Sequence, residues 1–215
     1  MGVAAFDAAA FDFLFRKPAM ILLQQRFVMI PVFILMVTTI LVSVSRPWRY
    51  TILALVAQYL SVAWLVAMVW PIGLALVKLV VGWMSSAILG ATQTDKKEEE
   101  KGGFVVQGFL FHLFAIGVVW LVVFSVTPFV VNWFSAPVHL LWGSLLLIGV
   151  GLLQMGISGE PFRIFVGLLT ALAGFEVLYA SVESSVLVAG LLAIVNLGLA
   201  LAGSYLMVVN TLEEL

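Results

Sequence analysis

Two ionisable side chains lie inside long apolar stretches, and they are where chemistry is to be expected. Glu176 is part of "TALAGFEVLYASVESS" (170–185), and Lys78 is part of "LALVKL" (74–79). A charge at the centre of a bilayer costs roughly 2.5–3.5 kcal/mol on insertion scales, so such residues are rare and mark proton pathways or packing contacts. A buried carboxyl group can hold a proton, or ionise when a lysine approaches it. Glu176 and Lys78 are therefore our first candidates for a proton or ion relay.

Four further polar residues complete the set of relay candidates: Gln58, Asn196, Glu183 and His112. Glu183 follows Glu176 at helical spacing, but two positions for it stay open. It lies in a loop if the helix ends within "SVESS" (181–185), or beyond Glu176 on the same face if the helix continues toward Gly190. His112, in the first turns of its expected helix, either joins a chain from the cytoplasmic side or is an interfacial residue.

No other kind of chemistry is indicated. The chain contains no cysteine, which excludes disulfides, thiolate metal sites and cysteine nucleophiles. It also lacks a phosphate-binding loop, a dinucleotide fingerprint, a zinc-binding helix and a nucleophile motif. We therefore expect no catalytic residue, no metal and no cofactor.

The composition is that of an integral membrane protein. The 215 residues are 64% hydrophobic and 10% charged, with a mean hydropathy of +1.21, whereas soluble domains average about 45–50% apolar and about 25% charged residues. The net charge of −1 gives no reason to expect nucleic acid as a partner. We expect an all-α polytopic fold in a bacterial-type inner membrane.

Runs of about 20 apolar residues predict seven spanning helices. The expected spans are 27–44, 50–69, 72–91, 104–125, 138–157, 162–181 and 186–209. An N-terminal interfacial amphipathic segment (1–26) precedes a first three-helix module (27–91). A charged cytoplasmic loop (92–103), a connecting helix with an interfacial loop (104–137) and a second three-helix module (138–215) follow.

The basic residues predict the orientation of these spans. One side of the membrane receives Arg46, Arg49, Lys96, Lys97, Lys101 and Arg163, and the other receives Arg16, Lys17 and Arg26. Because cytoplasmic loops carry the excess of Lys and Arg, the N-terminus is expected outside and the C-terminus in the cytoplasm.

The two modules show weak similarity to each other at an offset of 118 residues. Gln58 then aligns with Glu176, and "LALVKL" (74–79) aligns with "LAIVNL" (192–197), so that Lys78 meets Asn196. Small residues follow at intervals of four on the same faces, which favours close helix packing there; they are Gly82, Ser86 and Gly90 in one module and Ala200 and Ser204 in the other. The pattern is consistent with a parallel repeat of two three-helix modules joined by one helix, or with chance matching of apolar sequence.

Two interpretations of the intramembrane charges stay open. Lys78 lies about two turns into its helix, so it either points into the protein on the small-residue face or extends to the nearby interface. If Lys78 and Glu176 do face the interior, they form a proton relay, or a static contact that sets helix register.

Two stretches resemble a known family. "GFEVLYAS" (174–181) resembles the stretch around the intramembrane glutamate of the small K-type membrane subunit of complex I. "RPWRYTILALVAQYL" (46–60), followed by "LALVKLVVGWM" (74–84), resembles the membrane E component of group-4, formate-hydrogenlyase-type hydrogenases, which has seven helices and is itself K-subunit-like. The resemblance places Gln58, Lys78 and Glu176 on the family's polar positions. A second glutamate of the K-type subunit would fall near Ile194–Asn196, where this chain has no carboxylate.

The resemblance implies a non-catalytic membrane subunit of a complex-I-like or antiporter-like bioenergetic complex. Its partners would be the lipid bilayer and other membrane subunits, in particular large antiporter-like ones, and its polar residues would contribute to proton or cation translocation. A structural scaffold or assembly subunit with no transport role, and a stand-alone small transporter, are the alternatives.

Overall fold

The computed structural model describes residues 17–45, 47–93, 106–134, 136–183 and 185–213, and within these ranges it is helical with short turns. Residues 1–16 of the expected interfacial segment and 94–103 of the charged loop lie outside the described residues. The helices are α2 (Lys17–Val44), α3 (Trp48–Ala67), α4 (Ile72–Ala91), α6 (Val106–Trp133), α7 (Val138–Ile157), α8 (Pro161–Val182) and α9 (Val186–Glu213).

Six of these helices are long and apolar enough to cross a membrane, which agrees with the expected all-α membrane fold. In α2, the apolar stretch among residues whose side chains are described is shorter, Met29–Val44. α2 begins at Lys17 and continues without a break, so the last ten residues of the expected segment 1–26 are part of the same helix. Helix is the natural state of such sequences because hydrocarbon offers no partner for backbone N–H and C=O groups.

Prolines mark where four of the helices begin. Pro47, Pro71 and Pro137 stand directly before α3, α4 and α7 with extended backbone, and Pro161 is the first residue of α8. A proline has no N–H to donate, so these positions cost no intrahelical hydrogen bond. The connections before these four helices are therefore short.

The structure also corrects the end of the fourth expected span, 104–125. Residues 127–137 were expected to form an interfacial loop, but α6 continues through Pro128 to Trp133. An internal proline removes one backbone hydrogen bond, whereas an unwound segment facing lipid would leave several polar groups without partners. The stretch after Pro128 is also mostly apolar, with Phe129 exposed at 73% and Trp133 at 89%, so it extends an outward-facing helix.

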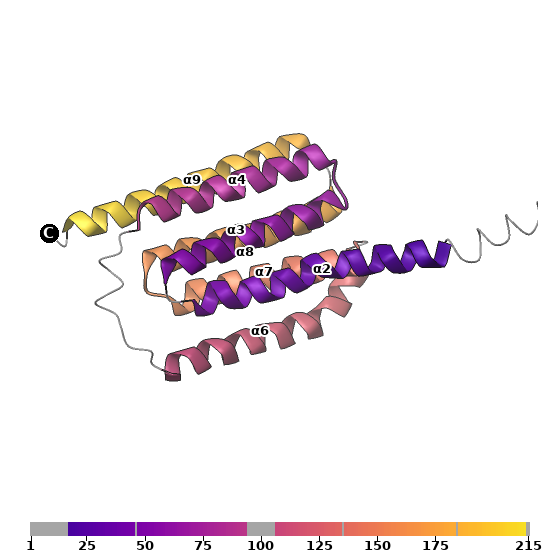
Figure 1. Cartoon of the computed structure of the whole chain (residues 1–215), viewed down its shortest axis with the longest axis horizontal. Helices are drawn as coiled ribbons and strands as arrows, with labels where there is room; N and C mark the ends of the chain where they lie inside the picture. The colour runs from indigo at the N-terminus through magenta and orange to yellow at the C-terminus, as the bar shows by residue number, and fades with distance from the viewer. Residues whose placement is uncertain (1–16, 46, 94–105, 135, 184, 214–215) are drawn as a thin grey trace, which may run out of the picture.

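The helices form two three-helix sets that lie face to face (Figure 1). α2, α3 and α4 pack in sequence order, as do α7, α8 and α9, and each helix of one set also contacts one helix of the other: α2 contacts α7, α3 contacts α8, and α4 contacts α9. α6 packs on α7 and α2 at the edge of the bundle opposite α4 and α9.

Side-chain hydrogen bonds join the two sets at both ends of the bundle. At the end where α3 and α8 begin, here called the Arg163 end, Arg163 Nη2 donates to the Ser45 carbonyl at 2.8 Å. At the opposite end, here called the Trp70 end, Trp70 Nε1 donates to the Glu183 carbonyl at 3.1 Å. The hairpin turns of one set are thereby held to those of the other.

The tightest helix crossing is between α7 and α8, and it depends on glycine. A Cβ atom at Gly151 would lie 2.5 Å from the backbone nitrogen of Ala171 and 2.6 Å from the carbonyl oxygen of Gly167. A Cβ at Gly174 would meet the carbonyl oxygen of Ser144 at 2.7 Å. The two backbones touch directly at these points, as small residues permit in membranes.

We expect Gly151→Ala to destabilise the bundle, because the added methyl group meets backbone that cannot rotate away. Overpacking of this kind costs about 1–3 kcal/mol. Gly156→Ala on the same helix is the matched control, since nothing lies within 4 Å of a Cβ there. Unfolding of the purified protein in mixed micelles measures both variants, and equal stability of the two would contradict the account of this crossing.

Candidate functional site

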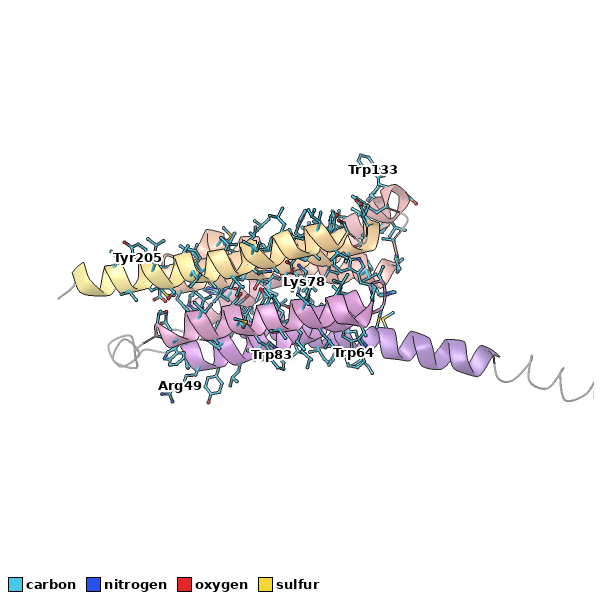
Figure 2. The ribbon with its side chains drawn as sticks, turned by 90° about the horizontal axis from the view of Figure 1, so that it is seen from above. Arg49, Trp64, Lys78, Trp83, Trp133 and Tyr205 are labelled. Carbon is cyan, nitrogen blue, oxygen red and sulfur yellow. The ribbon has the colours of Figure 1, made fainter. Side chains whose placement is uncertain are left out.

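Four helices bring one polar side chain each to a single cluster in the bundle interior. The cluster consists of Tyr59 on α3, Lys78 on α4, Glu176 on α8 and Asn196 on α9. All four are almost fully buried, with exposed fractions between 1% and 3%. Figure 2 shows Lys78 between the helices, whereas Arg49 and Tyr205 lie on the outside of the bundle.

The centre of the cluster is an ion pair. Lys78 Nζ lies 2.5 Å from Glu176 Oε1, and the two side chains are 3% and 1% exposed. Both residues lie about two turns, or ~9 Å, from the Trp70 end of their helices, well inside a hydrocarbon core about 30 Å thick. Lys78 therefore faces the interior, and its side chain does not extend to the interface.

Asn196 connects this ion pair to Tyr59. Its Nδ2 donates to Glu176 Oε1 at 2.8 Å, and its Oδ1 accepts the Tyr59 hydroxyl at 3.1 Å. The Tyr59 oxygen also lies 3.5 Å from the carbonyl oxygen of Leu169. A single amide thus orients both the carboxylate and the phenol, and the chain of contacts crosses all four helices.

Gly82 makes room for Tyr59 within this arrangement. A Cβ atom at Gly82 would lie 2.2 Å from the aromatic ring of Tyr59, so only glycine fits against it. Ser86 Oγ, one turn further along α4, donates to the Gly82 carbonyl at 2.8 Å. The small residue at position 82 therefore accommodates a side chain of α3.

The other residues of the predicted packing stripes differ in how deeply they are buried. Ser86 and Ala200 are fully buried. Gly90 and Ser204 are half-buried, and a Cβ at Gly90 would be in ordinary contact with Ile52 at 3.6 Å. α4 and α9 pack on each other along their lengths, so the predicted faces do include interior positions.

Gln58 is fully buried beside Tyr59 but is not part of the hydrogen-bonded cluster. Among the residues that the structure describes, neither Oε1 nor Nε2 of Gln58 has a hydrogen-bond partner, and the same holds for Glu176 Oε2. The carboxylate is therefore unevenly satisfied, with Lys78 and Asn196 both at one oxygen.

Two predicted relay residues lie elsewhere. α8 ends at Val182, which settles the open position of Glu183: it caps the helix in the turn, and its side chain is exposed. His112 lies on α6 next to Phe111, in a helix that packs on α7 and α2 rather than among the helices of the cluster. The structure brings together Lys78, Glu176 and Asn196, and it places Glu183 and His112 outside their cluster.

Sequence reasoning missed Tyr59. Its hydroxyl completes the chain of contacts to Asn196, yet the sequence shows only one more aromatic residue in an apolar stretch. The one available signal is Gly82, a glycine in the helix after the hairpin turn, but a glycine does not specify which side chain occupies the space beside it.

The cluster offers an acid–base pair rather than a set of metal ligands. Among the described residues, no group of three or more His, Asp or Glu side chains could hold a metal ion. An amine and a carboxylate in direct contact can instead share one proton between a charged and a neutral form, with Asn196 as a donor to the carboxylate.

Comparison with known proteins finds no family model that matches the chain, and no curated protein or solved structure matches it either.

We expect the contact between Lys78 and Glu176 to appear as strong coupling in a double-mutant cycle. Removing one partner of a buried ion pair costs about 3–5 kcal/mol, because an uncompensated polar group is left behind, whereas replacing both is often nearly neutral. Lys78→Met and Glu176→Leu should each lower the free energy of unfolding in mixed micelles. The double variant should lose less than either, and additive losses would contradict the pairing.

Proposed function

We propose that this chain is a non-catalytic integral membrane subunit of a complex-I-like or antiporter-like bioenergetic complex. Its Lys78–Glu176 pair serves there as a protonatable step in proton or cation translocation. The observation that carries the proposal is an ion pair buried between α4 and α8 and linked through Asn196 to Tyr59. Intramembrane ionisable pairs of this kind are expensive to build and are usually functional.

The uneven hydrogen bonding of Glu176 favours a relay over a static contact. A contact that only sets helix register is stabilised most when all lone pairs of the carboxylate have partners. Here Oε1 receives both Lys78 and Asn196, and Oε2 is buried without a partner among the described residues. An oxygen in that position can accept a proton without breaking an existing hydrogen bond.

The parallel repeat of two three-helix modules enters this proposal from the sequence offset alone. The helices of the two sets contact each other in the same order, α2 with α7, α3 with α8 and α4 with α9. A two-fold axis along the membrane normal would instead bring α2 against α9 and α4 against α7, so the packing does not have the symmetry of such a repeat. In this proposal the Arg163 end is cytoplasmic and the N-terminus is outside, as the basic residues indicate.

The partners in this proposal are lipid and larger membrane subunits. α6 is the least buried of the six candidate spans, and its outward face is apolar, with Phe114 exposed at 72% and Phe129 at 73%. The resemblance of "RPWRYTILALVAQYL" and "GFEVLYAS" to hydrogenase and complex I membrane subunits points to large antiporter-like subunits, and purification from native membranes tests for them.

The decisive substitution is Glu176→Gln. The amide keeps the shape of the side chain and an oxygen that accepts from Asn196, so assembly should persist, while the site can no longer carry a carboxylate proton. In inverted membrane vesicles that energise the complex through its own reaction, we expect dye-monitored proton or cation translocation to fall at least fivefold.

Glu183→Gln is the matched control, since that side chain is exposed in the turn after α8. It should leave both translocation and co-purification unchanged. If Glu176→Gln assembles normally and translocates at the original rate, the relay role is wrong. If Lys78→Met/Glu176→Leu also leaves the complex intact and fully active, the subunit is a scaffold whose polar cluster only fixes helix packing.

A further inference from the structure

Three helices around the cluster carry buried polar side chains that have no hydrogen-bond partner among the described residues. They are Gln58 on α3, Ser85 on α4 and Thr170 on α8, each with an exposed fraction of 0%. Leaving a buried polar group unpaired costs about 1–3 kcal/mol. Ordered water is the usual partner of such groups in folded proteins.

These side chains lie on the Arg163 side of the ion pair. Thr170 precedes Glu176 by six residues in α8, which places it about 9 Å closer to the Arg163 end. Ser85 follows Lys78 by seven residues in α4, two helical turns further toward the same end and on the same face. Gln58 adjoins Tyr59, whose hydroxyl contacts Asn196 at the Arg163 side of the carboxylate.

The Trp70 side of the ion pair is closed by apolar and aromatic packing. Val177 and Ala180, which follow Glu176 in α8, are 0% and 2% exposed, and Ala75 of α4 is 2% exposed. Trp70 is 4% exposed and stands edge-on to Tyr179 with ring centroids 6.5 Å apart. Its indole nitrogen is already bonded to the Glu183 carbonyl, so it offers no free donor to water.

We propose that water reaches the Lys78–Glu176 pair from the Arg163 end alone, along Gln58, Thr170 and Ser85, and that the Trp70 end is sealed. A small polar passage of this kind satisfies the unpaired atoms and extends to Glu176 Oε2. This inference rests on the proposed function, since one-sided access decides with which compartment the pair exchanges protons.

The absence of cysteine in the chain makes the test direct, because each substitution introduces a single thiol. Thr170→Cys and Ser85→Cys report on the proposed passage, and Val177→Cys and Ala180→Cys are matched controls on the sealed side. A thiol reacts with methanethiosulfonate reagents as the thiolate, which forms only where water is present. In native membrane vesicles we expect the first pair to react with a small reagent at least tenfold faster than the second.

A membrane-impermeant thiol reagent, added to vesicles of each orientation, shows from which side of the membrane the thiols are accessible. Gly159→Cys in the turn between α7 and α8, and Glu183→Cys in the turn after α8, serve as references for the two ends. Thr170→Cys should be modified only when the reagent is on the side that modifies Gly159→Cys. Slow modification of all four buried thiols, or modification from the Glu183 side, would overturn the proposal.

The thiol test decides the one-sided access of water, and the translocation test decides the relay role, so either proposal can be wrong without the other. Unreactive thiols together with a translocation defect in Glu176→Gln would overturn one-sided hydration and leave the relay role in place. Reactive thiols at positions 85 and 170 together with unchanged translocation in Glu176→Gln would confirm the passage and overturn the relay.

Discussion

The contact between Lys78 and Glu176 is the constraint on which the arrangement of this bundle depends. Two charges removed from water are tolerable only if they meet with good geometry and with further hydrogen bonds. That requirement forces α4 and α8 to present these residues to each other, although they lie in different three-helix sets. Asn196 and Tyr59 then bring α9 and α3 into the same network, so one polar contact specifies the relative position of four helices.

Apolar packing supplies the rest of the specificity. Lipid tails contact apolar side chains as favourably as another helix does, so helices in a membrane associate through close backbone contact. The glycines of α7 and α8 provide this contact. Gly82 has a different task, since it holds the ring of Tyr59 and thereby aims the hydroxyl at Asn196. The hydrogen bonds of Arg163 and Trp70 hold the turns of the two sets together at opposite ends.

The chemical character of the site follows from the incomplete hydrogen bonding of the Glu176 carboxylate among the described residues. In the part of the chain that the structure describes, Glu176 Oε1 has two hydrogen-bond partners and Oε2 has none, so Oε2 can accept a proton without breaking an existing hydrogen bond. Within the described ranges, unpaired polar atoms lie on one side of the pair and apolar packing with Trp70 lies on the other. In the function that we propose, this asymmetry sets the compartment with which the pair exchanges protons.

The sequence by itself determined the helical membrane class, the positions of most helix ends to within a few residues, and three of the four polar residues of the cluster, Lys78, Glu176 and Asn196. Hydropathy and proline placement are local properties, so they needed no knowledge of packing. The start of α2 and the end of α6 were misplaced, the latter because lipid overrides the local tendency of Pro128. Only the tertiary structure decided that Lys78 pairs with Glu176 across 98 residues, that Tyr59 joins them, and that Glu183 and His112 do not. The reason is physical: which polar faces meet depends on how helices far apart in the sequence cross, and neither hydropathy nor residue spacing within one helix registers that crossing.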